Sequence, residues 1–262
     1  MILVAGGTGR LGTKVVGLLL QRRLEVRVVT RDRSRAAHLA GTGVDIVEGD
    51  VRNLPAVLRA VAGARTVVSA IQGFAGTKDG NPATIDRDGN RNLILAAREA
   101  GVEHFVLVSV KDASPDHPAQ LMRMKYAAEQ DLKTSGLAWT IIRPTAHPAM
   151  RGDVIEVGGP DNLTMTAFVD AFRKEIGSSG NVGHISPPAM RLMGLVMSLV
   201  NPALARQIQM GVIMDTRPQA FDASDTRRRY PSIPVTSLNE VVRRDYAAAR
   251  GLVHGSPSDA HA

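Results

Sequence analysis

Three glycines close to the start of the chain have the spacing of a phosphate-binding turn. Gly6, Gly9 and Gly12 follow the apolar run Ile2–Ala5 and open a segment with helical periodicity. Glycine suits these positions because the backbone must turn tightly, approach a diphosphate closely and bring the helix against the strand, and the positive end of that helix would face the phosphates. The expected contacts of this dinucleotide site are Gly6, Thr8, Gly9, Arg10, Leu11 and Gly12. The alternative is a glycine-rich turn without a ligand.

The residues after the second apolar run decide between the two nicotinamide dinucleotides. At the end of this strand an acidic residue binds the ribose 2′-hydroxyl of NAD, whereas an arginine accommodates the 2′-phosphate of NADP. Val26–Val29 is followed by Arg31, with Arg33 and Arg35 just beyond. This arrangement favours NADP(H). If Asp32 is the ribose ligand instead, the arginines are only solvated and NAD(H) is the cofactor.

Hydrophobic periodicity predicts the elements that position these residues. As far as residue 145, short apolar runs without alternation take turns with segments of helical periodicity, as expected of strands buried on both faces of a parallel sheet. The expected strands are Ile2–Ala5, Val26–Val29, Val44–Val47, Thr66–Ser69, Phe105–Ser109 and Trp139–Ile142. The expected helices include Leu54–Val61, Ile85–Ala100 and Ala119–Thr134. This repeat predicts an α/β fold with a doubly wound, Rossmann-type parallel sheet.

After Pro144 the pattern changes to longer helical segments. We expect one more strand at Val154–Val157 and then a smaller, mostly helical part. Its expected helices are Thr164–Ile176, Met190–Met210 with a break at Asn201, and Ser237–Arg250. The predicted organisation is an NAD(P)-binding Rossmann domain at residues 1–150, a C-terminal substrate or lid part at 151–254, and a flexible tail at 255–262.

Composition limits the class of protein. The chain has 262 residues, of which 44% are apolar and 22% charged, as in ordinary folded domains. The absence of cysteine excludes disulfides, thiolate metal sites and cysteine nucleophiles, and it favours the cytoplasm. No metal site is expected. The formal net charge is +7, but only 3% of the residues are aromatic, too few for a platform on which bases stack, so we expect no nucleic-acid partner.

No segment has the character of a membrane span or a leader. The apolar stretch Ala189–Val200 contains Arg191 and is shorter than the roughly 20 residues that a bilayer requires. The chain begins directly with the apolar run Ile2–Ala5, which is too short for a signal segment and has no basic residues before it. We therefore expect a protein without a membrane anchor.

The residues beyond the glycine turn resemble the atypical short-chain dehydrogenase/reductases, in particular the NmrA-like NAD(P)-binding group. The matching stretches are Ile2–Gly12, Val28–Arg31, Glu48–Val51, Thr66–Ala70, Asp86–Val102, Phe105–Ser109 and Lys125–Pro144. In that family Asp50 and Val51 would lie at the adenine, and Ala70 and Ile71 beside the diphosphate and ribose. The resemblance implies a Rossmann fold that binds NADP(H), with NAD(H) as the alternative.

The catalytic pair of the short-chain reductases is incomplete in this chain. These enzymes use Tyr-x-x-x-Lys, in which the tyrosine is the acid and the lysine holds the nicotinamide ribose. Lys125 stands in place, but Leu121 occupies the tyrosine position, and Tyr126 is about 100° away around the helix. In many NmrA-like members the lysine is either the sole base or a cofactor ligand, and both roles stay open for Lys125. Ser109, which ends a strand, is the second catalytic candidate; its alternative is a buried structural hydroxyl.

Two features of the C-terminal half have competing interpretations. Met190, Met193 and Met197 form a helical stripe that could line an apolar substrate pocket, although ordinary core packing is favoured. Only a short segment separates Pro144 from Gly159, where NmrA-like proteins have a longer stretch on the substrate side. We therefore expect that part of the substrate pocket is missing or rebuilt from the C-terminal half.

Together these features predict an NADPH-dependent oxidoreductase that acts on a small apolar carbonyl, quinone or enone. The retained Lys125 and the methionines of the C-terminal half favour this hypothesis. The missing tyrosine and the short segment after Pro144 favour the alternative, a non-catalytic NAD(P)-sensing regulatory protein of the NmrA-like type. The substrate is an unidentified small molecule, and the expected state is a monomer or a homodimer.

Overall fold

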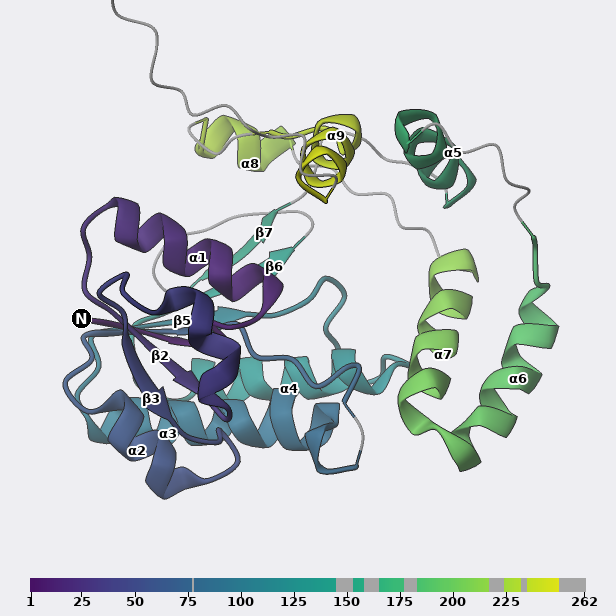
Figure 1. Ribbon diagram of the computed structural model, residues 1–262. Coiled ribbons are helices and arrows are strands. Elements are labelled where there is room, and N and C mark those ends of the chain that lie inside the picture. Colours follow the sequence, from purple (N-terminus) through teal and green to yellow (C-terminus); the bar gives the residue numbers. More distant parts are fainter. Residues whose placement is uncertain are drawn as a thin grey trace, which may run out of the picture.

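Seven parallel strands form one sheet in the computed structural model of the protein (Figure 1). The structure describes residues 1–76, 78–144, 153–157, 165–176, 183–216, 224–231 and 235–249. The strands are β1 (Ile2–Ala5), β2 (Val26–Thr30), β3 (Asp45–Glu48), β4 (Thr66–Ser69), β5 (His104–Val108), β6 (Trp139–Pro144) and β7 (Asp153–Val157). Their order in the sheet is β3-β2-β1-β4-β5-β6-β7. The predicted doubly wound α/β fold is confirmed.

The chain winds in two directions from β1. Strands β2 and β3 lie on one side of β1, and β4 to β7 follow on the other side. Where the strand order reverses, between β1 and β4, the connections leave toward opposite faces and a crevice opens at the carboxyl ends of the strands. The glycine turn after β1 and the residues after β4 therefore meet at this crevice.

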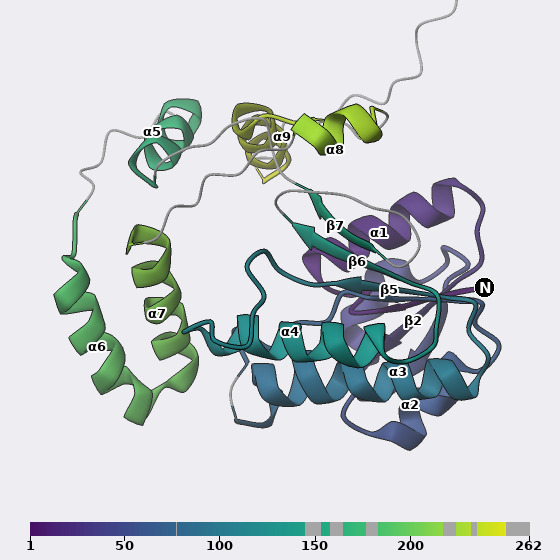
Figure 2. The ribbon, with the colours of Figure 1, turned by 180° about the vertical axis from the view of Figure 1, so that it is seen from behind.

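Helices cover both faces of the sheet. The helices α2 (Leu54–Val61), α3 (Asn90–Glu99) and α4 (Gln120–Lys133) lie on one face, and α1 (Arg10–Gln21) lies on the other (Figures 1 and 2). Leu3 packs in the core cluster that contains Phe105, whereas the next residue, Val4, packs in a second cluster with Val16 and Val28. Successive strand residues point to opposite faces, so both must be apolar, which explains the apolar runs without alternation.

The segment before α3 differs from the continuous helix that we expected over Ile85–Ala100. Residues Ala83–Gly89 form a π-helix, which leads directly into α3. π-helical turns are rare and are found mostly at functional sites, since the extra residue per turn re-aims the neighbouring side chains. This one lies at the edge of the crevice and contributes Ile85 to its wall.

The C-terminal part is helical apart from β7. Its helices are α5 (Met165–Ile176), α6 (Pro187–Val200), α7 (Pro202–Thr216), α8 (Ser224–Arg229) and α9 (Leu238–Ala249). α6 and α7 form a hairpin with the expected break at Asn201, and α5 packs against α9 (Figure 2). β7 pairs with β6, so the sheet continues past the expected boundary at residue 150. The expected tail 255–262 lies outside the described residues, and no described helix is long and apolar enough to cross a membrane.

Candidate cofactor site

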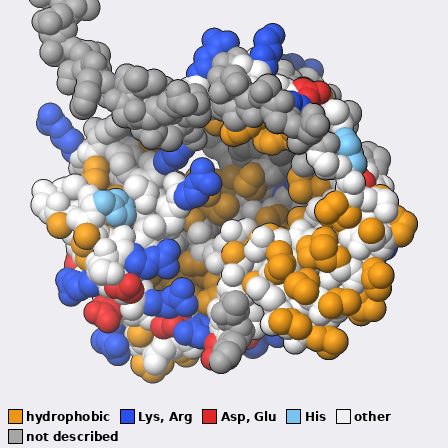
Figure 3. Space-filling model, turned by 45° about the vertical axis from the view of Figure 1, so that its right-hand side comes forward, with side chains coloured by type: hydrophobic (Ala, Val, Ile, Leu, Met, Phe, Trp, Pro, Cys, Tyr) orange, Lys and Arg blue, Asp and Glu red, His pale blue; other side chains and the backbone are white. Residues whose placement is uncertain are grey.

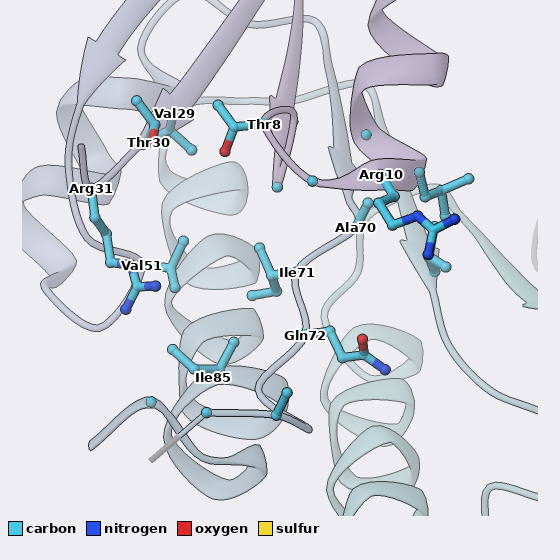
Figure 4. Close-up of a pocket in the computed structure, with 18 of the residues that line it drawn as sticks. Thr8, Arg10, Val29, Thr30, Arg31, Val51, Ala70, Ile71, Gln72 and Ile85 are labelled. Carbon is cyan, nitrogen blue, oxygen red and sulfur yellow. The ribbon is translucent and has the colours of Figure 1, made fainter. Parts of the chain in front are cut away.

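A cavity of about 990 Å³ lies at the carboxyl ends of the strands (Figure 4). The predicted site residues that line it are Gly6, Thr8, Gly9, Arg10, Leu11, Gly12, Arg31, Val51, Ala70, Ile71, Ser109 and Lys125. Asp50 does not line it. The residues that our sequence analysis did not assign to the site are Val29, Thr30, Arg35, Gly49, Arg52, Gln72, Ala75, Gly76, Asp79, Gly80, Ile85, Val108, Val110 and Pro144. Val29, Thr30, Val108 and Pro144 lie at the carboxyl ends of strands and Gly49 directly follows one, which is the signal that could have identified these five. The others lie in loops, in 3₁₀ helices and in the π-helix, where the sequence offered no such signal.

Two glycines of the turn after β1 are required by the fold itself. Gly6 has a φ of +85°, and a Cβ there would lie 2.6 Å from the carbonyl oxygen of Ala70. A Cβ on Gly12 would lie 2.0 Å from the carbonyl oxygen of Gly6. Neither position tolerates a side chain. At Gly6 it would collide with the backbone of Ala70, just after β4, and at Gly12 it would push α1 away from the turn.

Gly9 is different, because the space beside it opens into the cavity. A Cβ on Gly9 would meet only the carbonyl oxygen of Gly6, at 3.3 Å. Gly9 is the N-cap of α1 and makes no side-chain hydrogen bond there, and the first turn contains no acidic residue. The first amides of a helix have no intrahelical acceptor, so the N–H groups at Arg10 and Leu11 can face an anion in the cavity. The turn therefore fits a diphosphate.

At the end of β2, Arg31 and Asp32, the two candidates for binding the adenosine ribose or its 2′-phosphate, have different surroundings. Arg31 lines the cavity near Val51 (Figure 4), and Arg35 also lines it. Asp32 instead caps the 3₁₀ helix Arg33–Leu39, since its carboxylate accepts hydrogen bonds from the backbone N–H and the hydroxyl of Ser34, at 2.8 and 2.6 Å. These hydrogen bonds hold the pKa of the Asp32 carboxyl below its usual range. The geometry thus favours Arg31 over Asp32 as a ligand.

Asp50, which the resemblance places at the adenine, is separated from the cavity by Arg52. Its carboxylate accepts from Arg52 Nε at 3.0 Å and from Nη2 at 2.5 Å, and this pairing lowers the pKa of Asp50. Arg52 Nη1 also donates to the carbonyl oxygen of Asp79 at 3.1 Å. Val51 and Arg52 line the cavity, so Asp50 reaches the site only through Arg52, which ties two loops of the wall together.

Lys125 is buried beneath the cavity with its ammonium group surrounded by acceptors. Its Nζ donates to the carbonyl oxygens of Ile71 at 3.0 Å and Val108 at 2.9 Å, and it forms an ion pair with Asp86 Oδ1 at 3.1 Å. Only 3% of the lysine side chain is exposed. Two of the ammonium hydrogens therefore have backbone acceptors, whereas Asp86 Oδ1 lies at ion-pair distance and makes no hydrogen bond to the described residues. Contact with a ribose requires Lys125 to offer its third hydrogen or to exchange one of the backbone acceptors.

Asp86, the partner of Lys125, was not among the predicted site residues. It lies on the π-helix, is fully buried, and its Oδ2 accepts from the backbone N–H of Gly73 at 2.8 Å. Burial raises the pKa of Asp86, and the nearby Lys125 ammonium opposes this shift. The available signal was the position of Asp86 inside the stretch Asp86–Val102 that matches the family.

The hydroxyl of Ser109 is directed into the protein. Ser109 directly follows β5, and its Oγ donates to Glu129 Oε1 at 2.5 Å. Glu129 is fully buried and also accepts from Arg143, with Nε at 2.9 Å and Nη2 at 2.6 Å. Because its hydrogen is engaged, Ser109 can accept but not donate a hydrogen bond in the cavity in this arrangement. The hydroxyl is thus buried as the alternative supposed, with a carboxylate as its partner.

The α6–α7 hairpin holds one rim of the cavity. Arg206 of α7 donates through Nε to the carbonyl oxygen of Phe74 at 3.1 Å, and through Nη2 to that of Gly76. Partial burial lowers the pKa of this arginine. The loop 72–76 lines the cavity through Gln72, Ala75 and Gly76. Contacts from a distant part of the sequence thus fix a loop of the Rossmann domain.

The methionines of α6 do not line this cavity. A Cβ on Gly211 of α7 would lie 2.9 Å from Met190 Cε, which places Met190 in the contact between α6 and α7. Met193 is 39% exposed and no residue of α6 is fully buried, so the core packing that the sequence favoured does not extend to the whole methionine stripe. The segment between Pro144 and β7, where the expected shortening falls, lies outside the described residues.

A Rossmann sheet with a glycine turn after β1, a helix N-terminus facing a cavity and an arginine after β2 defines a dinucleotide-binding protein. The sequence matches the NAD(P)H-binding family over residues 6–164, and the chain belongs to this family. The predicted NAD(P)H-binding function of the Rossmann part is therefore confirmed, and the family agrees with the resemblance to NmrA-like proteins.

Individual relatives match the N-terminal half of the chain. It is 37% identical to an NAD(P)H azoreductase of Xenophilus azovorans over 145 residues, which are 55% of this chain and 47% of that protein. It is 32% identical to the photosystem II assembly factor Ycf39 of Cyanophora paradoxa over 145 residues, 54% of this chain and 44% of that protein. The matched part is thus about half the length of these relatives.

Solved structures match almost the whole chain at lower identity. The NADPH-dependent quinone oxidoreductase QOR2 of Escherichia coli, solved with NADPH, has a TM-score of 0.73 at 20% identity, covering 94% of this chain and 100% of that one. The triphenylmethane reductase of a Citrobacter species has a TM-score of 0.71 at 16% identity, covering 93% and 98%. At these identities the likeness establishes the fold, including the C-terminal helical part.

Proposed function

We propose that this protein is an NADPH-dependent oxidoreductase whose hydride acceptor is a small apolar quinone, enone or carbonyl compound. The observation that carries the proposal is the 990 Å³ cavity, which continues from the glycine turn past Lys125 to Ser109 and Pro144. This volume is at the upper end of the roughly 300–1,000 Å³ of small-molecule and cofactor sites. The lining residues extend from the phosphate-binding turn to the ends of β5 and β6, where a second small molecule would meet the cofactor.

The cavity residues divide by role along its length. The amides at the start of α1 would bind the diphosphate, Arg31 with Arg35 would bind the 2′-phosphate, and Val51 would pack on the adenine. The opposite end, at Ser109 and Pro144, would receive the nicotinamide and the substrate. The bound cofactor supplies the hydride, and the protein contributes position and an environment with little water.

The surroundings of Lys125 and Ser109 favour a quinone as the acceptor. Reduction of a ketone or aldehyde creates an alkoxide, which needs an acid at the moment of hydride transfer. Here Lys125 donates to two carbonyl oxygens and is paired with Asp86, Ser109 donates to Glu129, and Leu121 stands where the acid would be. A reduced quinone spreads its charge over the ring and can take its proton from water. The azoreductase and quinone oxidoreductase named above add support.

A substrate panel tests the proposal. We expect steady NADPH oxidation with small quinones and at least tenfold lower kcat/KM with aldehydes and ketones of similar size. NADPH consumption and product should agree in stoichiometry. Equal or faster turnover of the aldehydes would overturn the choice of quinone, because it would require an acid that this arrangement does not offer.

The second candidate is a non-catalytic NAD(P)-sensing regulatory protein. The engaged states of both Lys125 and Ser109 favour it, since neither side chain is free to react. Tight binding of NADPH without turnover across the whole panel would support this function and reject the first. In either case we place the protein in the cytoplasm, with small molecules and no nucleic acid as ligands, which the cysteine-free and aromatic-poor composition supports.

A further inference from the structure

The outer face of α6 is apolar and exposed. Leu192, Leu195, Val196 and Leu199 recur at the spacing i, i+3, i+4, i+7, the stripe that a helix normally buries. Their exposed fractions are 64%, 69%, 51% and 87%. Ile185 before the helix and Val200 at its end extend the face and are 58% and 77% exposed. Figure 3 shows a broad apolar patch on this side of the molecule.

The other face of α6 contacts α7, although no residue of α6 is fully buried. A Cβ on Gly194 would lie 3.4 Å from Ile208 Cγ2 of α7. Arg206 and Gln209 of α7 donate in turn to carbonyl oxygens of the Rossmann domain. The hairpin is therefore anchored with the stripe, defined here as Ile185, Leu192, Leu195, Val196, Leu199 and Val200, directed away from the domain.

The undescribed segments of the chain are poor candidates to cover this stripe. Residues 145–152, 158–164, 177–182, 217–223, 232–234 and 250–262 each contain at most two of Leu, Ile, Val, Met and Phe. None of them can present a complementary row of aliphatic side chains. None of the described elements covers the stripe, so we look for its occupant outside the described part of the chain.

The composition of this face favours a second copy of the same chain as its partner. Arg191 is the single charged residue of α6, and residues 183–214 contain no Asp or Glu. Arg191 borders the stripe, four residues before Leu195, so the face carries one cation at its edge and no carboxylate. The stripe itself is aliphatic, and two copies of an aliphatic stripe are complementary to each other. A closed two-fold contact uses the same patch on both subunits, and homodimer interfaces are the more apolar class.

The size of the stripe agrees with such a contact. Six aliphatic side chains, exposed by half or more, carry roughly 300–500 Å² of apolar surface on the scale of about 60–120 Å² for each fully exposed one. A standard interface buries about 800 Å² on each partner, of which roughly 500 Å² is apolar in homodimers.

We propose that α6 is the contact between two copies of this chain. The two helices pack through their stripes around a two-fold axis close to Leu195 and Val196, so that the α6–α7 hairpins of both subunits bury each other. The proposal concerns the assembly and is independent of the reaction that the cavity supports.

The mass in solution tests the proposal. We expect sedimentation velocity to give twice the chain mass of 27.9 kDa at micromolar concentrations. The double variant Leu195→Glu/Leu199→Glu should be monomeric, since it brings charges together across the axis. The matched control is Leu18→Glu on α1, which is 60% exposed and should leave the dimer intact. Circular dichroism and NADPH binding of each variant establish that the fold is retained.

Cross-linking tests the geometry directly, because the natural chain contains no cysteine. The variant Val196→Cys should form a disulfide between two subunits under mild oxidation, and Leu18→Cys should not. A wild-type monomer at every concentration would overturn the proposal, as would a dimer that survives Leu195→Glu/Leu199→Glu. A monomer that binds phosphatidylglycerol vesicles through the stripe would also overturn it and would assign the surface to membranes.

Discussion

At the scale of single residues, Lys125 and Ser109 lie at the cavity but already hold internal partners. Lys125 donates hydrogen bonds to the carbonyl oxygens of Ile71 and Val108 and is paired with Asp86, and Ser109 donates to Glu129. Removing one member of a buried ion pair costs about 3–5 kcal/mol, whereas replacing both members with apolar residues is often nearly neutral. A structural role and a ligand role for Lys125 can therefore be separated by experiment.

We expect Lys125→Met alone to destabilise the protein by about 3 kcal/mol, at the lower end of that range because burial already favours the protonated form of Asp86. The double variant Lys125→Met/Asp86→Leu should recover most of this stability. If Lys125 also holds the cofactor, NADPH affinity should stay at least fivefold lower in the double variant. Urea unfolding and fluorescence titration measure the two quantities, and full recovery of affinity would leave Lys125 with a structural role only.

Arg31 should determine the preference between the two dinucleotides. A charge-assisted hydrogen bond to a 2′-phosphate contributes about 1.5–3 kcal/mol, so Arg31→Ala should weaken NADPH binding roughly 10- to 100-fold. NADH affinity should remain within a factor of two. Isothermal titration with both cofactors measures this. Equal losses for both would mean that Arg31 is structural and would return Asp32 to consideration.

A substitution at Gly9 should weaken cofactor binding while the protein still folds, unlike substitutions at Gly6 or Gly12. Gly9→Val would fill the cavity side of the turn, where a Cβ meets only one carbonyl oxygen at 3.3 Å. Cofactor affinity should fall at least tenfold, about 1.4 kcal/mol, with little change in melting temperature. Gly17→Ala on the same helix is the control, since a Cβ there meets nothing within 4 Å. Unchanged NADPH titration in Gly9→Val would contradict the diphosphate assignment.

At the scale of elements, the walls of the site depend on segments that are far apart in the sequence. The π-helix Ala83–Gly89 brings Asp86 beneath the loop 72–76, and Arg206 of α7 holds the same loop from outside. A loop fixed from both sides loses little entropy when a ligand binds, which favours affinity. The C-terminal helices thus affect the cofactor site without lining the cavity.

We expect Arg206→Met to loosen this loop. The variant leaves the carbonyl oxygens of Phe74 and Gly76 without their charged donor, which should lower the free energy of unfolding by about 1–3 kcal/mol. NADPH should dissociate several times faster in stopped-flow measurements. Arg98→Met on α3, an exposed arginine, is the control. An unchanged dissociation rate would show that the hairpin and the cofactor loop are not coupled.

At the scale of the whole molecule, Asp86 gives stability a pH dependence opposite to that of Asp50. Burial raises the pKa of Asp86 above its ordinary value of 3.8, so the folded protein binds this proton more tightly than the unfolded chain. The resulting stabilisation is complete below pH 3.8 and is lost as the pH rises through the raised pKa. For Asp50, whose pKa is lowered, the stabilisation is present above 3.8 and is lost as the pH falls.

We therefore expect Asp86→Asn to change the pH profile of stability. The free energy of unfolding of the wild type minus that of the variant should decrease as the pH is raised above 3.8, because only the wild type loses the Asp86 proton. Urea unfolding at a series of pH values measures the difference. Asp88→Asn, an exposed neighbour, should show no such trend. A difference that grows with pH would contradict the assigned direction.

The sequence by itself determined the parallel sheet and the cofactor-binding turn. Apolar runs without alternation and the spacing of Gly6, Gly9 and Gly12 are patterns of residue type that a short stretch of sequence displays, even though the contact that requires Gly6 is made by the distant Ala70. The break between two helices at Asn201 and the arginine after β2 were likewise predictable from the sequence. These features therefore agree between the predicted and the described elements.

Only the tertiary structure decided which polar side chains at the cavity already have hydrogen-bond or ion-pair partners inside the protein. The partners of Lys125 and Ser109 lie 39 and 20 positions away along the chain, at Asp86 and Glu129. The π-helix Ala83–Gly89 overlaps a segment for which periodicity predicted one continuous α-helix, because hydrophobic spacing does not distinguish a π-helical turn from an α-helical one. The outer stripe of α6 has the same pattern as a buried one, because spacing shows that a helix has an apolar face but not whether another element covers it.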